Sequence, residues 1–195
     1  MDQEKRKTEI QQRSSRVTEF RAIENDGVRS IEAYFAVFSD IYEIFPGYTE
    51  SVDAHAFDST INDDIRCLVN HDTTRVLGRT KPGTLRLSID NYGLKGVVDI
   101  NDDDQDAVNQ YARVKRGDVS QCSFGFEILS EEVEVRPDGS VHWTLKSVKL
   151  YEVSIVTFPA YEKTEAVARS RMEQAFEIWK KRMKARLKHG TETTT

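Results

Sequence analysis

The sequence predicts a mainly β protein of the α+β class, in which short strands form a barrel or a sandwich with a few helices around it. Two observations support this prediction. Short runs of alternating apolar and polar residues recur, as in Ser30–Phe38, Leu85–Ile89 and Asp118–Phe126. Turn-forming residues separate the runs, most clearly Asn25-Asp26-Gly27 and Arg136-Pro137-Asp138-Gly139. Many short strands joined by such turns are typical of barrels and sandwiches.

Ordered structure is expected to begin near Val17, with the Asn25–Gly27 turn leading into the strand Ser30–Phe38. A compact apolar strand, Ile65–Asn70, should then deliver His71 at its carboxyl end, and Asp72-Thr73-Thr74 should turn the chain. The same alternation predicts further strands at Val76–Thr80, Leu85–Ile89, Leu94–Ile100, Glu131–Val135, Ser140–Leu145 and Val148–Thr157.

Two segments have a helical pattern. Acidic residues within Asn101–Asp106 precede Ala107, Tyr111 and Val114, which are spaced four and three positions apart. Lys115-Arg116-Gly117 follow, so a helix is expected here. A calcium loop from Asp99 is disfavoured, because an EF-hand needs glycine and glutamate where this chain has Asp104 and Gln110. The second helix has one apolar stripe, formed by Val167, Met172, Phe176, Trp179, Met183 and Leu187.

Length and composition indicate one domain with appended ends. Its 195 residues divide into a flexible arm (1–15), a β-barrel domain (16–161), an amphipathic helix (162–189) and a flexible tail (190–195). The net charge of -5 argues against direct nucleic-acid binding, and no apolar run is long enough for a membrane span. Cys67 and Cys122 both lie in apolar strand patterns, which favours buried thiols in a reducing compartment over a disulfide.

The stretch Asp118–Phe126 contains the candidate nucleophile. Alternation puts Ser120, Cys122 and Phe124 on the core face, and Ser123 with Gly125 on an open face. A glycine inside a strand marks a bulge or the close approach of a backbone or ligand. Ser123 is therefore preferred over Ser120 as a nucleophile, although a bulge in an ordinary barrel strand would explain the same residues.

Four further motifs accompany this stretch in a fixed order: Asn70-His71-Asp72, Leu77–Thr80, Gly83–Leu87, and Tyr151–Ser154 leading to Phe158-Pro159-Ala160. The ordered set resembles the prohead maturation proteases of tailed phages of the HK97 type, which are distantly similar to the herpesvirus assemblin proteases. The resemblance covers roughly Ser30 to Ala168. It implies a partly open antiparallel β-barrel of the assemblin type with surrounding helices, and a short helix at Ala54–Ile61.

The resemblance also implies the catalytic residues. His71 matches the catalytic histidine of the family, although a turn histidine bonded to Asp72 is the structural alternative. Glu152 shares its strand face with apolar residues, so its carboxylate should be partly buried and needs a partner, for which His71 would serve. An arginine, Arg79 or Arg113, is the alternative partner.

The third catalytic position has two further candidates. His142 follows Ser123 at the separation that assemblins use for their second histidine, and Asp72 adjoins His71. His55 and His189 are expected to be solvated, and no residues are singled out as donors to an oxyanion hole.

The resemblance implies a serine endopeptidase that needs no cofactor and no metal. Its substrates would be the scaffolding segment of the major capsid protein and the enzyme itself, cut inside the immature prohead in the host cytoplasm. A homo-oligomer is left open. The rival hypothesis is a non-catalytic capsid-assembly or scaffold module that keeps the same barrel.

Overall fold

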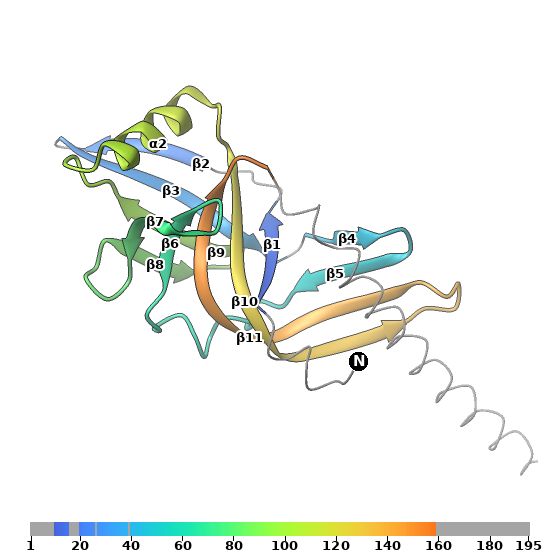
Figure 1. Ribbon diagram of the computed structural model, residues 1–195. Helices are drawn as coiled ribbons and strands as arrows, with labels where there is room; N and C mark the ends of the chain where they lie inside the picture. Colours follow the sequence, from blue (N-terminus) through green and yellow to red (C-terminus); the bar gives the residue numbers. More distant parts are fainter. Residues whose placement is uncertain (1–9, 16–19, 26, 39, 159–195) are drawn as a thin grey trace, which may run out of the picture.

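The computed structural model describes residues 10–15, 20–25, 27–38 and 40–158. In this part of the chain the strands form two sheets, and one helix lies beside them (Figure 1). The prediction of a mainly β fold is therefore confirmed.

The larger sheet has the order β1-β10-β11-β5-β4, and β6 and β7 continue it beside one end of β11. β10 and β11 are antiparallel, whereas β5 and β6 both pair with β11 in parallel. Its strands are β1 (Gln11–Ser15), β4 (Tyr42–Phe45), β5 (Tyr48–Val52), β6 (Arg66–Val69), β7 (Asp72–Arg79), β10 (Gln121–Val135) and β11 (Val141–Val156).

The smaller sheet is antiparallel, with the order β2-β3-β9-β8. The predicted hairpin joins β2 (Phe20–Asn25) to β3 (Val28–Val37), and a second hairpin joins β8 (Leu85–Ile89) to β9 (Gly93–Asp99). These four strands agree closely with the alternating runs in the sequence.

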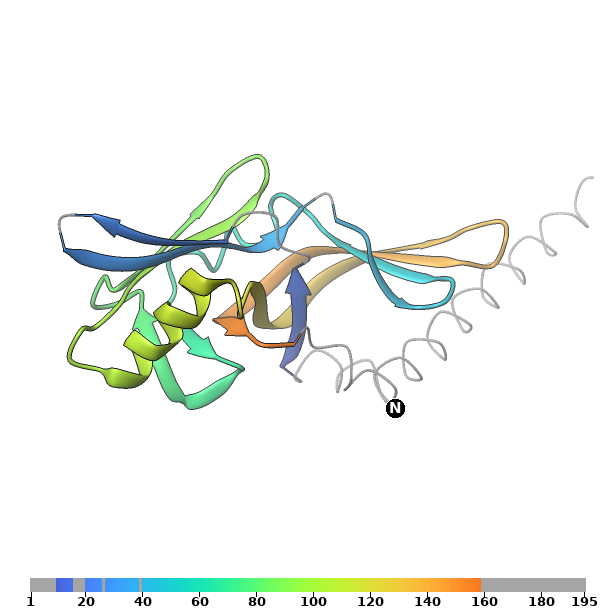
Figure 2. The ribbon, with the colours of Figure 1, turned by 90° about the horizontal axis from the view of Figure 1, so that it is seen from above.

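The expected barrel is not closed. The described strands fall into two separately hydrogen-bonded sheets. The predicted strands Glu131–Val135, Ser140–Leu145 and Val148–Thr157 are parts of β10 and β11, which run for 15 and 16 residues. Their far halves extend from the body as an arm, with β4 and β5 beside them (Figure 2). Alternation shows which face of a strand is buried, but not which strand edges pair.

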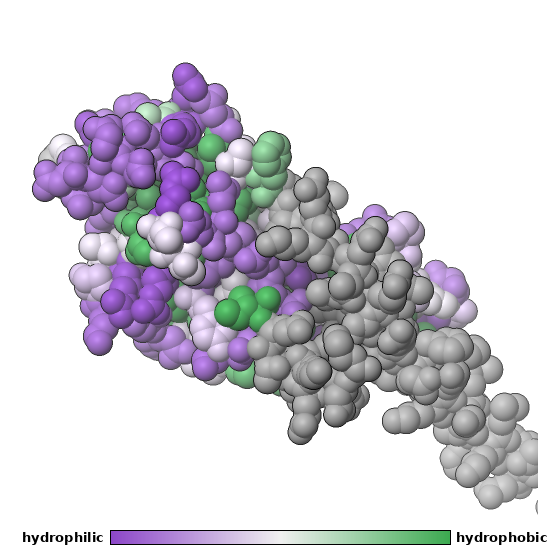
Figure 3. Space-filling view, in the orientation of Figure 1, coloured by the Kyte–Doolittle hydropathy of each residue, from purple (hydrophilic) through white to green (hydrophobic). Residues whose placement is uncertain are grey.

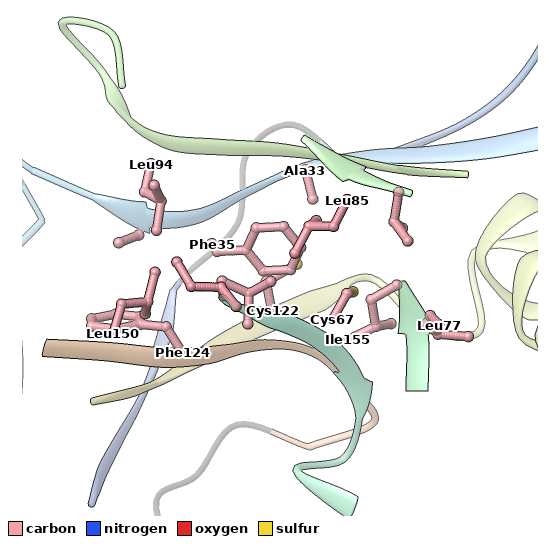
Figure 4. Packing of buried hydrophobic residues seen from close by; sticks show 14 of the residues in the cluster. Ala33, Phe35, Cys67, Leu77, Leu85, Leu94, Cys122, Phe124, Leu150 and Ile155 are labelled. Atoms are coloured by element: carbon pink, nitrogen blue, oxygen red, sulfur yellow. The ribbon is translucent and has the colours of Figure 1, made fainter. Parts of the chain in front are cut away.

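The main core lies between the two sheets. Phe35 of β3, Leu94 of β9 and Phe124 of β10 are almost fully buried there and lie in one cluster (Figure 4). Phe57 packs edge-on against Phe124, with 5.6 Å between ring centroids. A small second cluster, around Val141 and Trp143, supports the arm.

The short helix expected at Ala54–Ile61 is instead a succession of turns. The Asp53 carboxylate accepts a hydrogen bond from the His55 backbone N–H at 2.9 Å. Side-chain bonds of this kind compete with helical bonds, which is why Asp and Ser favour turns. The turns still bury Phe57, so the segment contributes to the core.

The helix predicted after residue 101 is confirmed as α2 (Gln105–Arg116). Asp104 caps its start by accepting from the backbone N–H groups of Asp106 and Ala107, and Gly117 ends it with a φ of 88°. Asp99 pairs with Arg86, and the described residues contain no group of side chains suited to a metal ion.

The expected flexible arm has an ordered end, because Gln11–Ser15 form β1 at the edge of the larger sheet. Val17, the helix at 162–189 and the tail at 190–195 lie outside the described residues, so those boundaries stay predictions. No helix in the described ranges is long and apolar enough to cross a membrane. The face shown in Figure 3 is largely hydrophilic, with small separate hydrophobic spots.

Candidate active site

His71 lies in a tight hairpin between β6 and β7. The pairing of Val69 with Asp72 leaves Asn70 and His71 as the two turn residues, with φ angles of 54° and 59°. The turn therefore comes earlier than predicted, and Asp72 already begins β7. Positive φ at both positions matches the turns preferred in two-residue hairpins, where asparagine is favoured first and glycine second, so a histidine in the second position is uncommon.

Contacts with β11 hold this unusual turn in place. The Asn70 backbone N–H donates to the Ile155 carbonyl at 2.9 Å. The Asn70 side-chain oxygen accepts from the Thr157 N–H at 2.8 Å. The hairpin is thereby fastened to the end of β11, and His71 is positioned over that strand.

The His71 ring contacts Glu152 of β11. Nδ1 of His71 lies 2.6 Å from Oε1 of Glu152, and the two side chains are only 13% and 11% exposed. A carboxylate accepts hydrogen bonds, so this contact places the proton on Nδ1 and leaves the lone pair on Nε2. Nε2 is buried and has no hydrogen-bond partner among the described residues.

Ser154 completes the network around the carboxylate. Its hydroxyl donates to Oε2 of Glu152 at 2.6 Å and accepts from the His71 backbone N–H at 3.2 Å. Both carboxylate oxygens are thus hydrogen-bonded, as a buried charge requires. Ser154 is itself fully buried, so the arrangement is shielded from solvent competition.

Gly125 makes room for this carboxylate. It pairs with Glu152 across β10 and β11, and a Cβ atom placed on Gly125 would lie 2.2 Å from Oε1 of Glu152. The sequence predicted a bulge at this glycine or the close approach of a backbone or a ligand. The strand register does shift between Gly125 and Phe126, and the group that approaches closely is the Glu152 side chain.

Ser123 lies on the same face of the sheet, between Ser14 of β1 and Ser154 of β11. Its hydroxyl donates to the carbonyl oxygen of Arg13 at 2.8 Å, and the residue is fully buried. The prediction of an open face is therefore wrong, since Ser123 is buried and β1 pairs with β10 beside it. No hydrogen bond joins Ser123 to His71 within the described part of the chain.

Other nucleophiles are less suited to the chemistry. Ser120 precedes β10 and is exposed, instead of lying on the core face, since the strand begins only at Gln121. Burial raises the pKa of Cys122 well above its ordinary value, and the pKa of Cys67 rises through burial and the nearby Glu152 charge. Both thiols therefore stay protonated, whereas the thiolate is the reactive form.

The alternative third residues have other partners. The ring nitrogens of His142 lie 2.8 Å and 2.9 Å from the hydroxyls of Thr49 and Ser51 on the arm. Asp72 accepts from the backbone N–H and hydroxyl of Thr74. His55 is exposed beside Asp58, and His189 lies outside the described residues.

The arginines proposed as partners of Glu152 also bind elsewhere. Arg79 pairs with Asp64, and Arg113 donates to Gln110. The geometry therefore favours Glu152 over His142 and Asp72 as the partner of His71.

Sequence reasoning did not identify the role of Ser154, nor the contacts of Arg13 and Glu50 described below. A signal for Ser154 was present, because residues two apart in a strand share a face and Glu152 was already a candidate. Nothing in the local sequence pairs Arg13 with Glu50, which lie 37 positions apart.

Comparison with known proteins assigns the chain to a sequence family. Residues 16–177 match the sequence family described as caudovirus prohead serine protease. The protein is therefore of the serine peptidase class. Since the match covers most of the sequence, the chain belongs to the caudovirus prohead serine protease family. No curated protein and no solved structure matches it.

Proposed function

We propose that this protein is a serine endopeptidase in which Ser123 is the nucleophile, His71 the general base and Glu152 the residue that orients His71. The observation that carries the proposal is the 2.6 Å contact between Nδ1 of His71 and Glu152, on the sheet face that also bears Ser123. Membership of a serine peptidase family favours an enzyme over a non-catalytic scaffold module.

The geometry suggests how the residues would act together. Glu152 holds the imidazole with its lone pair on Nε2, and this atom can take the proton from a serine hydroxyl. The Ser123 hydroxyl, which now donates to the Arg13 carbonyl, would turn about its Cα–Cβ bond toward Nε2. It would attack a peptide carbonyl carbon to form an acyl-enzyme, and His71 would return the proton to the departing amine.

The family supports a role in maturation of the phage prohead. We extend this to two substrates, the scaffolding segment of the major capsid protein and the enzyme itself, cut within the prohead in the host cytoplasm. The reaction as proposed uses no cofactor or metal, membrane or nucleic acid, and a homo-oligomer remains open. The two sheets would correspond to an opened form of the assemblin barrel.

Fluorophosphonate labelling of the purified full chain tests the nucleophile. The unsubstituted protein should be labelled at Ser123, and Ser123→Ala should lose both labelling and peptide cleavage while retaining its fold. The matched control is Ser120→Ala, because Ser120 is exposed and precedes the strand. Labelling that persists in Ser123→Ala, or that disappears in Ser120→Ala, would contradict the assignment.

A further inference from the structure

The short strand β1 pairs with β10 in the way that a bound peptide adds to a sheet edge. Gln11–Ser15 run antiparallel to β10, with Arg13 opposite Phe124 and Ser14 opposite Ser123 (Figures 1 and 2). Extended peptides commonly bind proteins by adding such a strand, in which backbone bonds give affinity and side-chain sites give selectivity. β1 also lies ahead of residues 16–177, which match the family.

The backbone of β1 reaches the nucleophile directly. The carbonyl oxygen of Arg13 accepts the 2.8 Å hydrogen bond from the Ser123 hydroxyl. A substrate of a serine protease must bring its carbonyl group next to the nucleophilic hydroxyl. The Arg13 carbonyl is such a neighbour of Ser123, and attack on its carbon requires the hydroxyl to turn toward Nε2 of His71.

The side chain of Arg13 is held by an acidic residue from the body of the protein. Its Nε lies 2.5 Å from Oε1 of Glu50, and one terminal nitrogen lies 3.3 Å from Oε2. The guanidinium also lies 5.8 Å from the ring centre of Phe126. A planar guanidinium that meets both carboxylate oxygens and lies near an aromatic ring is in a selective environment.

Glu50 belongs to the folded body of the protein. It is fully buried in β5, opposite Trp143 of β11, and the Arg13 side chain is 11% exposed. The positive charge of Arg13 balances the charge of this buried carboxylate. When another peptide replaces β1, a positively charged side chain at the same position could form the same ion pair.

From these contacts we propose that β1 occupies the substrate position, and that Glu50 selects arginine or lysine in the residue whose carbonyl meets Ser123. This inference rests on the proposed function, because it takes Ser123 as the nucleophile. The substrate class is an extended peptide with a basic residue immediately before the scissile bond. The first such bond is Arg13–Ser14 of the chain itself.

The cleavage step follows from the proposed chemistry. Nε2 of His71 takes the hydroxyl proton of Ser123 as Oγ bonds to the Arg13 carbonyl carbon. The bond from that carbon to the Ser14 nitrogen then breaks, and His71 gives the same proton to the Ser14 amine. Water then hydrolyses the ester, which releases the Arg13 carboxylate and restores the Ser123 hydroxyl. Departure of the released segment opens the edge of β10 to a capsid peptide.

The test uses the full chain and changes only the residue before the bond. Mass spectrometry would follow the product that begins at Ser14 in the unsubstituted protein, Arg13→Lys and Arg13→Gln. The unsubstituted protein and Arg13→Lys should be cut, and Arg13→Gln should be cut about 100-fold more slowly, as expected when a buried charge pair loses one partner. A normal rate in Arg13→Gln would overturn the proposal.

Glu50→Gln tests the selecting residue. In that background, arginine and glutamine at position 13 should be cut at similar rates, so the preference disappears. The double variant Arg13→Gln/Glu50→Gln removes both charges of this ion pair and separates selectivity from instability, with thermal melts alongside. Glu43→Gln is the matched control, because Glu43 is exposed on the neighbouring strand β4. Retention of the arginine preference in Glu50→Gln would refute the role of Glu50.

Failure of this inference can be told from failure of the proposed function. If fluorophosphonate labels Ser123 but no variant shows a cut between Arg13 and Ser14, β1 is only a structural strand and this inference alone is wrong. If Ser123 is not labelled in the unsubstituted protein, both proposals are wrong.

Discussion

Two histidines lie at different points along β11 and form contrasting contacts. His71 contacts Glu152 through Nδ1 only, and its Nε2 has no hydrogen-bond partner among the described residues. His142 lies in β11 itself and engages hydroxyls through both ring nitrogens. Ten positions of β11 separate His142 from Glu152, a distance of roughly 30 Å along an extended strand.

The difference shows what makes a histidine suitable for proton transfer. A base needs one nitrogen fixed by an acceptor and the other available to the reacting group. His71 meets this condition, with a carboxylate to balance the positive charge that it would acquire. His142 instead links β11 to β5 and stabilises the arm.

The largest expected effect comes from removing each ring in turn. His71→Ala should lower kcat/KM for a capsid scaffolding peptide on the order of 10⁶-fold, the scale seen when a serine protease loses its base. His142→Ala should lose about 1 kcal/mol of stability per hydrogen bond removed but retain kcat/KM within a few fold. Steady-state kinetics and thermal melts of both variants provide the measurement. Equal losses of activity would end the contrast between the two histidines.

The next effect concerns the acid behind His71. Glu152→Gln should keep the fold but reduce turnover by about 10⁴-fold, because an amide favours the wrong tautomer and cannot balance the imidazolium. Cleavage of the same peptide by Glu152→Gln and His142→Ala would measure this. Full activity in Glu152→Gln together with its loss in His142→Ala would transfer the orienting role to His142.

A smaller effect is expected from Gly125→Ala. The new methyl group would meet Oε1 of Glu152 at 2.2 Å, so the carboxylate must shift away from His71. A displacement of this size should lower kcat about 10²-fold. Gly96→Ala is the control, since its Cβ would crowd Phe35 in the smaller sheet and should cost about 1–3 kcal/mol of stability. The prediction is wrong if both variants have the same kcat per folded molecule.

The smallest effect is the pH dependence of the arm. Burial lowers the pKa of His142 below its usual 6.5, so the folded protein binds this proton less readily than the unfolded chain. Its contribution to stability is therefore complete above about pH 6.5 and declines as the pH falls below it. Melting temperatures between about pH 7 and about pH 5 should fall less in His142→Gln than in the unsubstituted protein. Identical slopes would show that His142 is not the titrating group.

Much of the fold could be predicted because its signals are local. Alternation located most strands, and acids, bases and a following glycine located α2 between Asp104 and Gly117. The helix expected at Ala54–Ile61 was wrong, since bonds such as that from the His55 N–H to Asp53 favour turns there. Mainly β structure was predicted correctly, whereas the arrangement of the strands in two sheets was not, because strand pairing depends on contacts far apart in the sequence.

The candidate site likewise has features that the sequence predicts and others that only the fold reveals. The sequence by itself determined that His71, Ser123 and Glu152 are present with suitable chemistry, and strand parity predicted a buried Glu152. Only the tertiary structure decided that Glu152 meets His71, and that Gly125 leaves the space for it. It also decided that Arg13 of a segment expected to be flexible meets Glu50 and Ser123. The physical reason is that alternation fixes the face of each side chain, whereas the partner across a strand edge depends on register and chain path.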